Sequence, residues 1–94
     1  MRIVYLRTAK PGLEWFLQYY GKVFPEGNAN ALARFDAMER LLETNPHVGQ
    51  KFGEAGARIL PIVRTPFGVV YRVKGDQIRV MKIVDYRSGK ARDG

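Results

Sequence analysis

The pattern of apolar and polar positions changes its period once, after the glycine-rich segment that ends at Gly56. Near the start, a β-branched and aromatic run over Arg2–Leu6 predicts a strand, which the turn-forming Thr8–Gly12 segment ends. Helical spacing follows, because apolar residues recur at i, i+3, i+4, i+7 and i+11. This stripe predicts a helix over Pro11–Phe24 and a core made by Leu13, Phe16, Leu17, Tyr20 and Phe24.

A second helix is predicted directly after the first. The Pro25–Asn28 segment breaks the first helix, Asn28 or Asn30 can cap the next one, and Asn45-Pro46 ends it. The two helices therefore form an α-hairpin, whose second apolar stripe consists of Ala31, Phe35, Met38 and Leu42.

The remainder of the chain has the pattern of strands. After a loop over His47–Gly56, short β-branched runs cover Arg58–Val63, Phe67–Val73 and Gln77–Val84. Gly75-Asp76 between the last two runs is a two-residue hairpin signal. We expect one α+β domain over residues 1–94, in the order β-α-α-β-β-β. Its twisted antiparallel sheet carries the N-terminal helical hairpin on one face.

The Gly75-Asp76 turn predicts a register, in which Lys74 opposes Gln77. Counting back pairs Val73 with Ile78, Arg72 with Arg79, Tyr71 with Val80 and Val70 with Met81. One face of the sheet is then expected to be apolar except for Lys82 and to lie under the helices, with Phe67, Val69, Tyr71, Val73, Ile78, Val80 and Val84. The other face is expected to hold Gly68, Val70, Arg72, Arg79, Met81 and Ile83.

Two arginines directly across from each other repel unless an anion lies between them. Arg72 and Arg79 therefore either receive a ligand or extend separately into water. Gly68 beside Ile83 would leave a notch in the same face, and Arg87, Lys90 and Arg92 of the tail would add positive charge next to it. This basic face is the best functional surface that the pattern offers.

Trp15 and Tyr19 lie opposite the apolar stripe of the first helix, where a surface helix is normally polar. Two interpretations stay open. The rings pack beneath the second helix or a loop, or they form a docking patch for another chain.

Composition narrows the class of protein. The 94 residues include 16 Lys and Arg against 9 Asp and Glu, a net charge of +7, and no cysteine. The positive charge favours a polyanionic partner. No apolar run approaches the roughly 18 to 20 residues of a membrane span, and the start lacks an export signal, so we expect a cytoplasmic location and no membrane partner.

The inventory for catalysis is small. His47 is the only histidine, its loop position favours a cap or an exposed ring, and the carboxylates show no pairing, so we expect no metal and no cofactor. Phosphate-binding glycine motifs are absent. Metal-free RNA cleavage stays open, in which arginines and lysines stabilise the phosphorane and a tyrosine, histidine or lysine moves the proton of the 2′-hydroxyl. The residues available for it are Arg58, Arg64, Arg72, Arg79, Tyr86 and Arg87.

With this order of elements, the segment Arg58–Arg87 resembles the RelE/ParE superfamily of toxins from type II toxin-antitoxin modules, and ParE-like members more than RelE-like ones. The most specific likeness lies in Arg58-x-Leu60-Pro61, Arg64-Thr65-Pro66-Phe67, Val70-Tyr71-Arg72-Val73 and Asp76-x-Ile78. The resemblance implies a toxin that a cognate antitoxin neutralises. ParE-like members usually poison DNA gyrase, whereas RelE-like members cut mRNA in the ribosomal A site.

Departures from the RelE-like pattern favour a binding toxin over an enzyme. Ile59 and Pro61 stand where the resemblance wants strand lysines, Gly68 stands in place of an arginine, and only Arg87 matches. The first hypothesis is a ParE-like gyrase inhibitor, and the alternative is a ribosome-dependent endoribonuclease that would use Arg58, Arg72, Arg79, Tyr86 and Arg87. We expect target contacts at Arg58, Arg72, Arg79 and Arg87, and antitoxin contacts at Trp15 and Tyr19.

Overall fold

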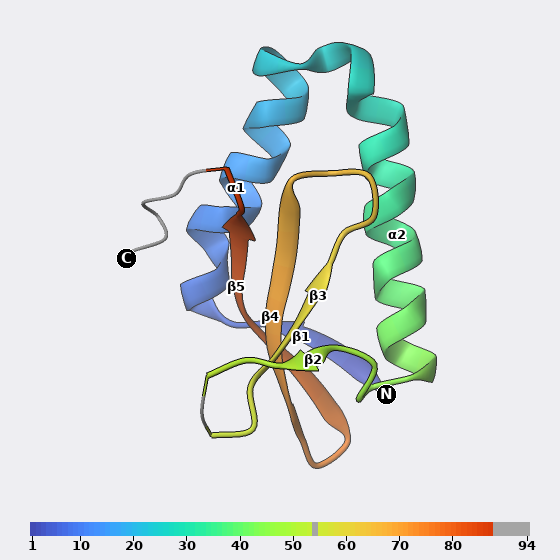
Figure 1. The fold of residues 1–94 in the computed structure, drawn as a ribbon, viewed down its shortest axis with the longest axis vertical. Helices are drawn as coiled ribbons and strands as arrows, with labels where there is room; N and C mark the ends of the chain where they lie inside the picture. The colour runs from blue at the N-terminus through green and yellow to red at the C-terminus, as the bar shows by residue number, and fades with distance from the viewer. Residues whose placement is uncertain (54, 88–94) are drawn as a thin grey trace.

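The helices and strands follow the predicted order (Figure 1). The computed structural model describes residues 1–53 and 55–87. Strand β1 spans Arg2–Tyr5, helix α1 Lys10–Gln18 and helix α2 Asn28–Thr44. The remaining strands are β2 (Gln50–Lys51), β3 (Arg58–Pro61), β4 (Phe67–Lys74) and β5 (Gln77–Asp85). The α+β class is confirmed, and the short strand β2 is an addition inside the predicted loop.

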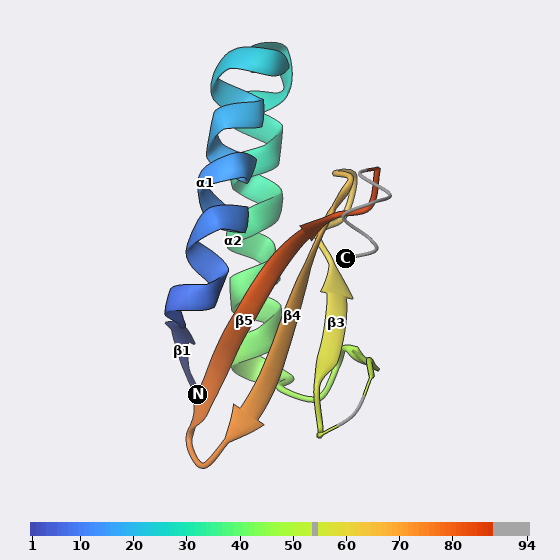
Figure 2. The same cartoon turned by 90° about the vertical axis from the view of Figure 1, so that its left-hand side faces the viewer.

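The two helices lie side by side on one face of the sheet (Figure 2). The strand order is β1-β5-β4-β3-β2, and the predicted antiparallel meander of β3, β4 and β5 is confirmed. Strand β1 instead pairs with β5 in parallel, so the sheet is mixed. The helical hairpin explains why β1 and β5 run in the same direction. It returns the chain to the level of Met1, whose amino group donates to the Glu43 carbonyl at 3.3 Å, so β3 starts at the same end of the sheet as β1. Strand β5 runs parallel to β3, because two antiparallel pairings separate them.

Helix α1 is rotated toward Tyr19 relative to the predicted stripe. Phe16 and Tyr20 are buried as predicted, whereas Leu17 is 51% exposed and Phe24 is 44% exposed, so their assignment to the core is wrong. The Tyr19 ring lies 5.9 Å from the Phe67 ring and takes the place on the core side that Leu17 was expected to fill. After α1 a single π turn over Tyr19–Val23 carries the chain to Phe24 at the hairpin tip.

The β4–β5 hairpin turns at Gly75, whose φ of 61° suits glycine. The predicted register is confirmed on this side of the hairpin: Lys74 pairs with Gln77, Val73 with Ile78, Arg72 with Arg79 and Tyr71 with Val80. Beyond it, a β-bulge inserts Met81, and Val70 pairs with Lys82. The predicted pairing of Val70 with Met81 is therefore wrong.

The bulge exchanges the faces of the last residues of β5, since two residues there oppose one. Ile83 pairs with Val69 and is buried, whereas Lys82 is exposed and Val84 lies across from Gly68. The predicted positions of Val84 on the helix side and Ile83 on the outer side are wrong. The physical gain is that Lys82, which a regular hairpin would place in the core, reaches water.

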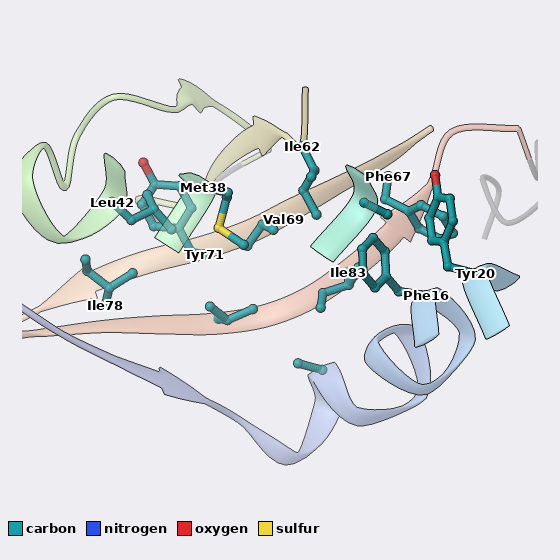
Figure 3. Close-up of a cluster of buried hydrophobic side chains, with 13 residues drawn as sticks. Phe16, Tyr20, Met38, Leu42, Ile62, Phe67, Val69, Tyr71, Ile78 and Ile83 are labelled. Carbon is teal, nitrogen blue, oxygen red and sulfur yellow. The ribbon is translucent and has the colours of Figure 1, made fainter. Parts of the chain in front are cut away.

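The core fills the space between the helices and the sheet (Figure 3). At one end Phe16 packs on Tyr20 and Phe67, with ring centroids 5.2 and 5.0 Å apart. At the other end Tyr71 lies with Leu42, and its buried hydroxyl accepts a 2.8 Å hydrogen bond from the Gly49 N–H. Within the described residues, neither helix has the length and apolar character needed to cross a membrane.

Candidate binding surfaces

The outer face of the sheet, on the side away from the helices, carries Arg72 of β4 directly opposite Arg79 of β5. Both side chains are half-buried, and Arg79 Nε donates a 3.0 Å hydrogen bond to Gln77 Oε1. Lys82 follows on the same face because of the bulge. The predicted pairing of two cations on one face is thus confirmed.

Arg72 differs from Arg79 in its hydrogen bonding. Its Nε is buried and has no hydrogen-bond partner among the residues that the structure describes. A buried donor on a charged group that stays unpaired is costly, and an acceptor placed there removes that cost. The unpaired donor and the repulsion between the two cations are the two costs that an anionic ligand at this pair would reduce.

The notch expected at Gly68 is filled. With Val84 rather than Ile83 across from it, Gly68 lies under Tyr86, and a Cβ on Gly68 would be 2.8 Å from Tyr86 Cζ. The absence of a side chain at Gly68 is what allows the Tyr86 ring to pack this close to the strand. Tyr86 is nevertheless 50% exposed, so it forms part of the surface itself.

A hollow of about 430 Å³ lies beside Tyr86 on the outer face. Most of its lining is apolar, and the two aromatic side chains among the lining residues, Phe52 and Tyr86, are 45% and 50% exposed. The lining residues are Val48, Gly49, Gln50, Phe52, Ile59, Leu60, Pro61 and Tyr86. Phe52 was not predicted as a surface residue of this site, because it lies in an irregular loop without hydrophobic periodicity.

Arg58 does not join the outer face. It pairs with Tyr71, a core residue, and therefore points to the helix side of the sheet. Its Nη1 donates to the carbonyl oxygens of His47 and Gly49 at 3.2 and 2.7 Å. Arg58 thus holds the loop before β2, and His47 contributes a backbone oxygen to that contact.

Arg87 is also separated from the arginine pair. Its Nε and Nη2 donate to Asp85 Oδ1 and Oδ2 at 3.0 and 2.8 Å, and its guanidinium carbon lies 4.2 Å from the centre of the Tyr19 ring. Trp15 Nε1 donates to Asp85 Oδ2 at 2.8 Å. These four residues, which we call the β5 clasp, join the end of β5 to α1.

The β5 clasp shifts the titration of both its charged groups. Hydrogen bonding from Arg87, supported by Trp15, holds the pKa of Asp85 at about 2, against burial, which acts in the opposite direction. The same pairing raises the pKa of Arg87. The ion pair therefore persists throughout the neutral pH range.

The structure shows what covers Trp15 and Tyr19 within the chain. Tyr19 lies beneath Arg87, in the turn that follows β5, as one interpretation expected, and Trp15 contacts Asp85 at the end of β5. Tyr19 is half-buried against the core, and Trp15 stays 37% exposed, with the two rings 5.9 Å apart. Only Trp15 presents a large free surface to a partner.

The described residues offer little for acid–base catalysis on the outer face. Burial raises the pKa of Tyr86 above its ordinary value, so its hydroxyl stays protonated at neutral pH. Ile59 and Pro61 both lie on this face, opposite Val70 and Gly68. Within residues 1–53 and 55–87 no three His, Cys, Asp or Glu side chains gather into a possible metal site. Lys90 and Arg92, expected near this face, lie outside the described residues.

Comparison with known proteins gives one informative result. No protein family's sequence model matches the chain, and no curated protein matches it. Among solved structures, a chain described as the chromosomal ParDE TA system from P. aeruginosa superposes with a TM-score of 0.70. It is 26% identical, and the match covers 90% of this chain and 95% of that chain. The similarity therefore extends over most of the length of both chains.

Proposed function

Because the chain is a ParE-like member of the RelE/ParE superfamily, we propose that it is the toxin of a type II toxin-antitoxin module that poisons DNA gyrase. A cognate antitoxin neutralises it. The toxin acts by binding in the cytosol, without a cofactor. The arginine pair of the outer face, Arg72 and Arg79, contacts the target.

The single observation that carries this proposal is a basic outer face without a matching base or nucleophile. A ribonuclease needs a group that takes the proton of the 2′-hydroxyl and cations around the same phosphate, all about 3 Å from the reacting atoms. Among the residues that line the hollow, Ile59 and Pro61 are uncharged where a ribonuclease would need cations, and Tyr86 is protonated where it would need a base. A toxin that acts by binding needs only the shaped basic surface.

RelE-like mRNA cleavage on the ribosome is the second candidate. What favours it is the position of Tyr86 on the same face as Arg72 and Arg79, since these groups would be the proton carrier and the phosphate ligands. Arg58 and Arg87 are engaged elsewhere, on the helix side of the sheet and in the β5 clasp. A ribonuclease on this face would therefore have only Arg72 and Arg79 of the four arginines that the resemblance to RelE-like toxins suggested for it.

For the antitoxin we propose contacts at Trp15, with Tyr19 beneath it. Trp15 is an exposed aromatic side chain whose indole nitrogen is already satisfied by Asp85, so a partner can bury the ring without leaving a polar group unpaired. A Trp15→Ala variant should weaken antitoxin binding by about 2 kcal/mol or more if the ring anchors the interface. Unchanged affinity combined with lower thermal stability would show that the ring serves only the β5 clasp.

The test of the function is to induce the protein in bacterial cells without an antitoxin. Filamentation, a DNA-damage response and trapped gyrase–DNA cleavage complexes are the expected results. Prompt translation arrest with cut mRNA and intact DNA would establish the ribonuclease instead. Normal growth at verified expression would contradict both toxin functions. When the arginine variants Arg72→Gln and Arg79→Gln are induced in the same way, Arg40→Gln is their matched control for the loss of one positive charge. Arg40 lies on α2, away from the outer face, in a pair with Asp36.

A further inference from the structure

The arginine pair and the apolar hollow belong to one continuous surface. Arg72 follows Val70 by two positions on β4, and Val70 lies across from Ile59, which lines the hollow. Two residues of a strand span roughly 7 Å, so the hollow lies roughly 7 to 14 Å from the guanidinium groups. An extended chain covers that distance with two to four residues.

The unpaired Nε of Arg72 indicates what belongs at the basic end. A carboxylate accepts two parallel hydrogen bonds from one guanidinium, and such charge-assisted pairs are about twice as strong as neutral ones. One carboxylate between Arg72 and Arg79 would remove the repulsion between the two cations, and a turn of the Arg72 side chain would bring its buried Nε to the same acceptor. Lys82, which pairs with Val70, adds positive charge on the same face between the arginine pair and the level of the hollow.

The other end of the surface favours an aliphatic or aromatic side chain. Val48, Ile59, Leu60 and Pro61 line the hollow, and burial of Phe52 and Tyr86 by a ligand would remove exposed apolar area from water.

A nucleic acid fits this surface less well. Single strands are held by cations that follow the phosphate backbone along a groove. Here the described cations of the outer face lie on β1, β4 and β5, as Arg2, Arg72, Lys74, Arg79 and Lys82, whereas the β3 positions Ile59 and Pro61 beside the hollow are uncharged.

We propose that the outer face recognises an extended acidic segment of the target protein. One carboxylate lies between Arg72 and Arg79, and an apolar side chain two or four positions away fills the hollow between Phe52 and Tyr86. This inference rests on the proposed function, since it specifies the part of the target that a binding toxin holds.

The first test measures binding of a defined probe to the whole protein by fluorescence anisotropy. The probes are labelled serine-rich peptides with one leucine and one aspartate, two or four positions apart. We expect at least one spacing to bind, and replacement of its aspartate by asparagine to weaken it by about tenfold or more. Replacement of its leucine by serine should weaken binding as well. No binding by either spacing, or equal binding of the aspartate and asparagine peptides, overturns the proposal.

Variants of the protein connect the probe to the surface. Arg72→Gln and Arg79→Gln should each reduce peptide affinity by about tenfold, whereas Arg40→Gln should leave it unchanged. Circular dichroism verifies the fold, and Arg72→Lys provides a second variant that keeps the charge but loses the bidentate geometry. Equal loss in Arg40→Gln would show an effect of net charge alone and contradict the proposal.

A 12-nucleotide single-stranded RNA distinguishes the other class of ligand. If the RNA binds more tightly than every peptide and loses its affinity in Arg72→Gln, the face is a nucleic-acid surface and the proposal fails. Peptide binding by a protein that does not arrest growth would refute the proposed function alone. Gyrase poisoning that persists in Arg72→Gln would refute this inference alone.

Discussion

The indole nitrogen of Trp15 donates a 2.8 Å hydrogen bond to Asp85, a residue 70 positions further along the chain. Arg87 pairs with the same carboxylate and covers the Tyr19 ring. The last described residues of the chain are therefore fixed to α1. An arginine that the sequence suggested for a target is already occupied within the molecule.

The β5 clasp predicts a dependence of stability on acid pH. The pKa of Asp85 is about 2 in the folded protein against 3.8 for a free side chain, so the unfolded state binds more protons between these values. The stabilisation is therefore complete above about pH 4 and is lost as the pH falls toward 2, by about 2 kcal/mol in total. Urea unfolding at pH 7, 4 and 2 measures it. The gap in stability between the wild type and Asp85→Asn should narrow as the pH falls, and a constant gap would contradict the assignment.

Trp15→Phe tests the hydrogen bond separately from the ring. The variant keeps an aromatic side chain beside Tyr19 and removes the donor, so we expect a loss of about 1 kcal/mol in the free energy of unfolding. In an Asp85→Ala background the same substitution should cost little, because the acceptor is already gone. Additive losses in the double variant would show that Trp15 acts through packing alone.

Two glycines of the first helical segment give a matched pair. A Cβ on Gly12 would lie 3.0 Å from the backbone carbonyl carbon of Ile83, whereas a Cβ on Gly21 would meet nothing within 4 Å. We expect Gly12→Ala to destabilise the protein by about 2 kcal/mol, since backbone must move, and Gly21→Ala to be neutral or stabilising by up to about 1 kcal/mol. Thermal unfolding of both variants measures the difference. Equal effects would contradict the close packing of α1 on β5.

The bulge at Met81 is tested by the two residues whose faces it exchanges. Ile83 is 6% exposed and lies in the core, so Ile83→Ala should cost about 2 to 4 kcal/mol. Val84→Ala, on the outer face, should cost less than about 1.5 kcal/mol. Denaturant unfolding compares them. A regular hairpin would give the reverse order.

Periodicity and turn chemistry were enough for the order of the elements and for half of the hairpin. Gly75-Asp76 determines which residues face each other near the turn, so the pairing of Arg72 with Arg79 followed from sequence. The bulge at Met81 did not, because a one-residue insertion leaves no trace in an alternating run whose following residues, Ile83 and Val84, are both apolar. The available signal was a lysine, Lys82, at a position where a regular strand would have buried its charge in the apolar face.

The candidate site was predictable only in part, for a similar reason. Charge and register identified the arginine pair, which depends on local pairing. The partners of Arg58 and Arg87 depend on contacts made through the tertiary fold, with the Gly49 carbonyl and with Tyr19. The alternation of Asp85 and Arg87 at the end of a strand was compatible with an ion pair, but nothing in the sequence placed Trp15 beside them.

The parallel pairing of β1 with β5 has a consequence for synthesis. A ribosome delivers Arg2–Tyr5 more than 70 residues before the partner residues Gln77–Val80, so the backbone groups of β1 stay hydrated until β5 has emerged. Tyr5, whose hydroxyl donates to Glu39 at 2.6 Å, can contact the finished helical hairpin earlier. The sheet closes in one late step of high sequence separation, which is the slow kind. The arginine pair of the outer face therefore forms only after β5 has been made, and a partner that recognises Arg72 opposite Arg79 encounters chains whose sheet has already closed.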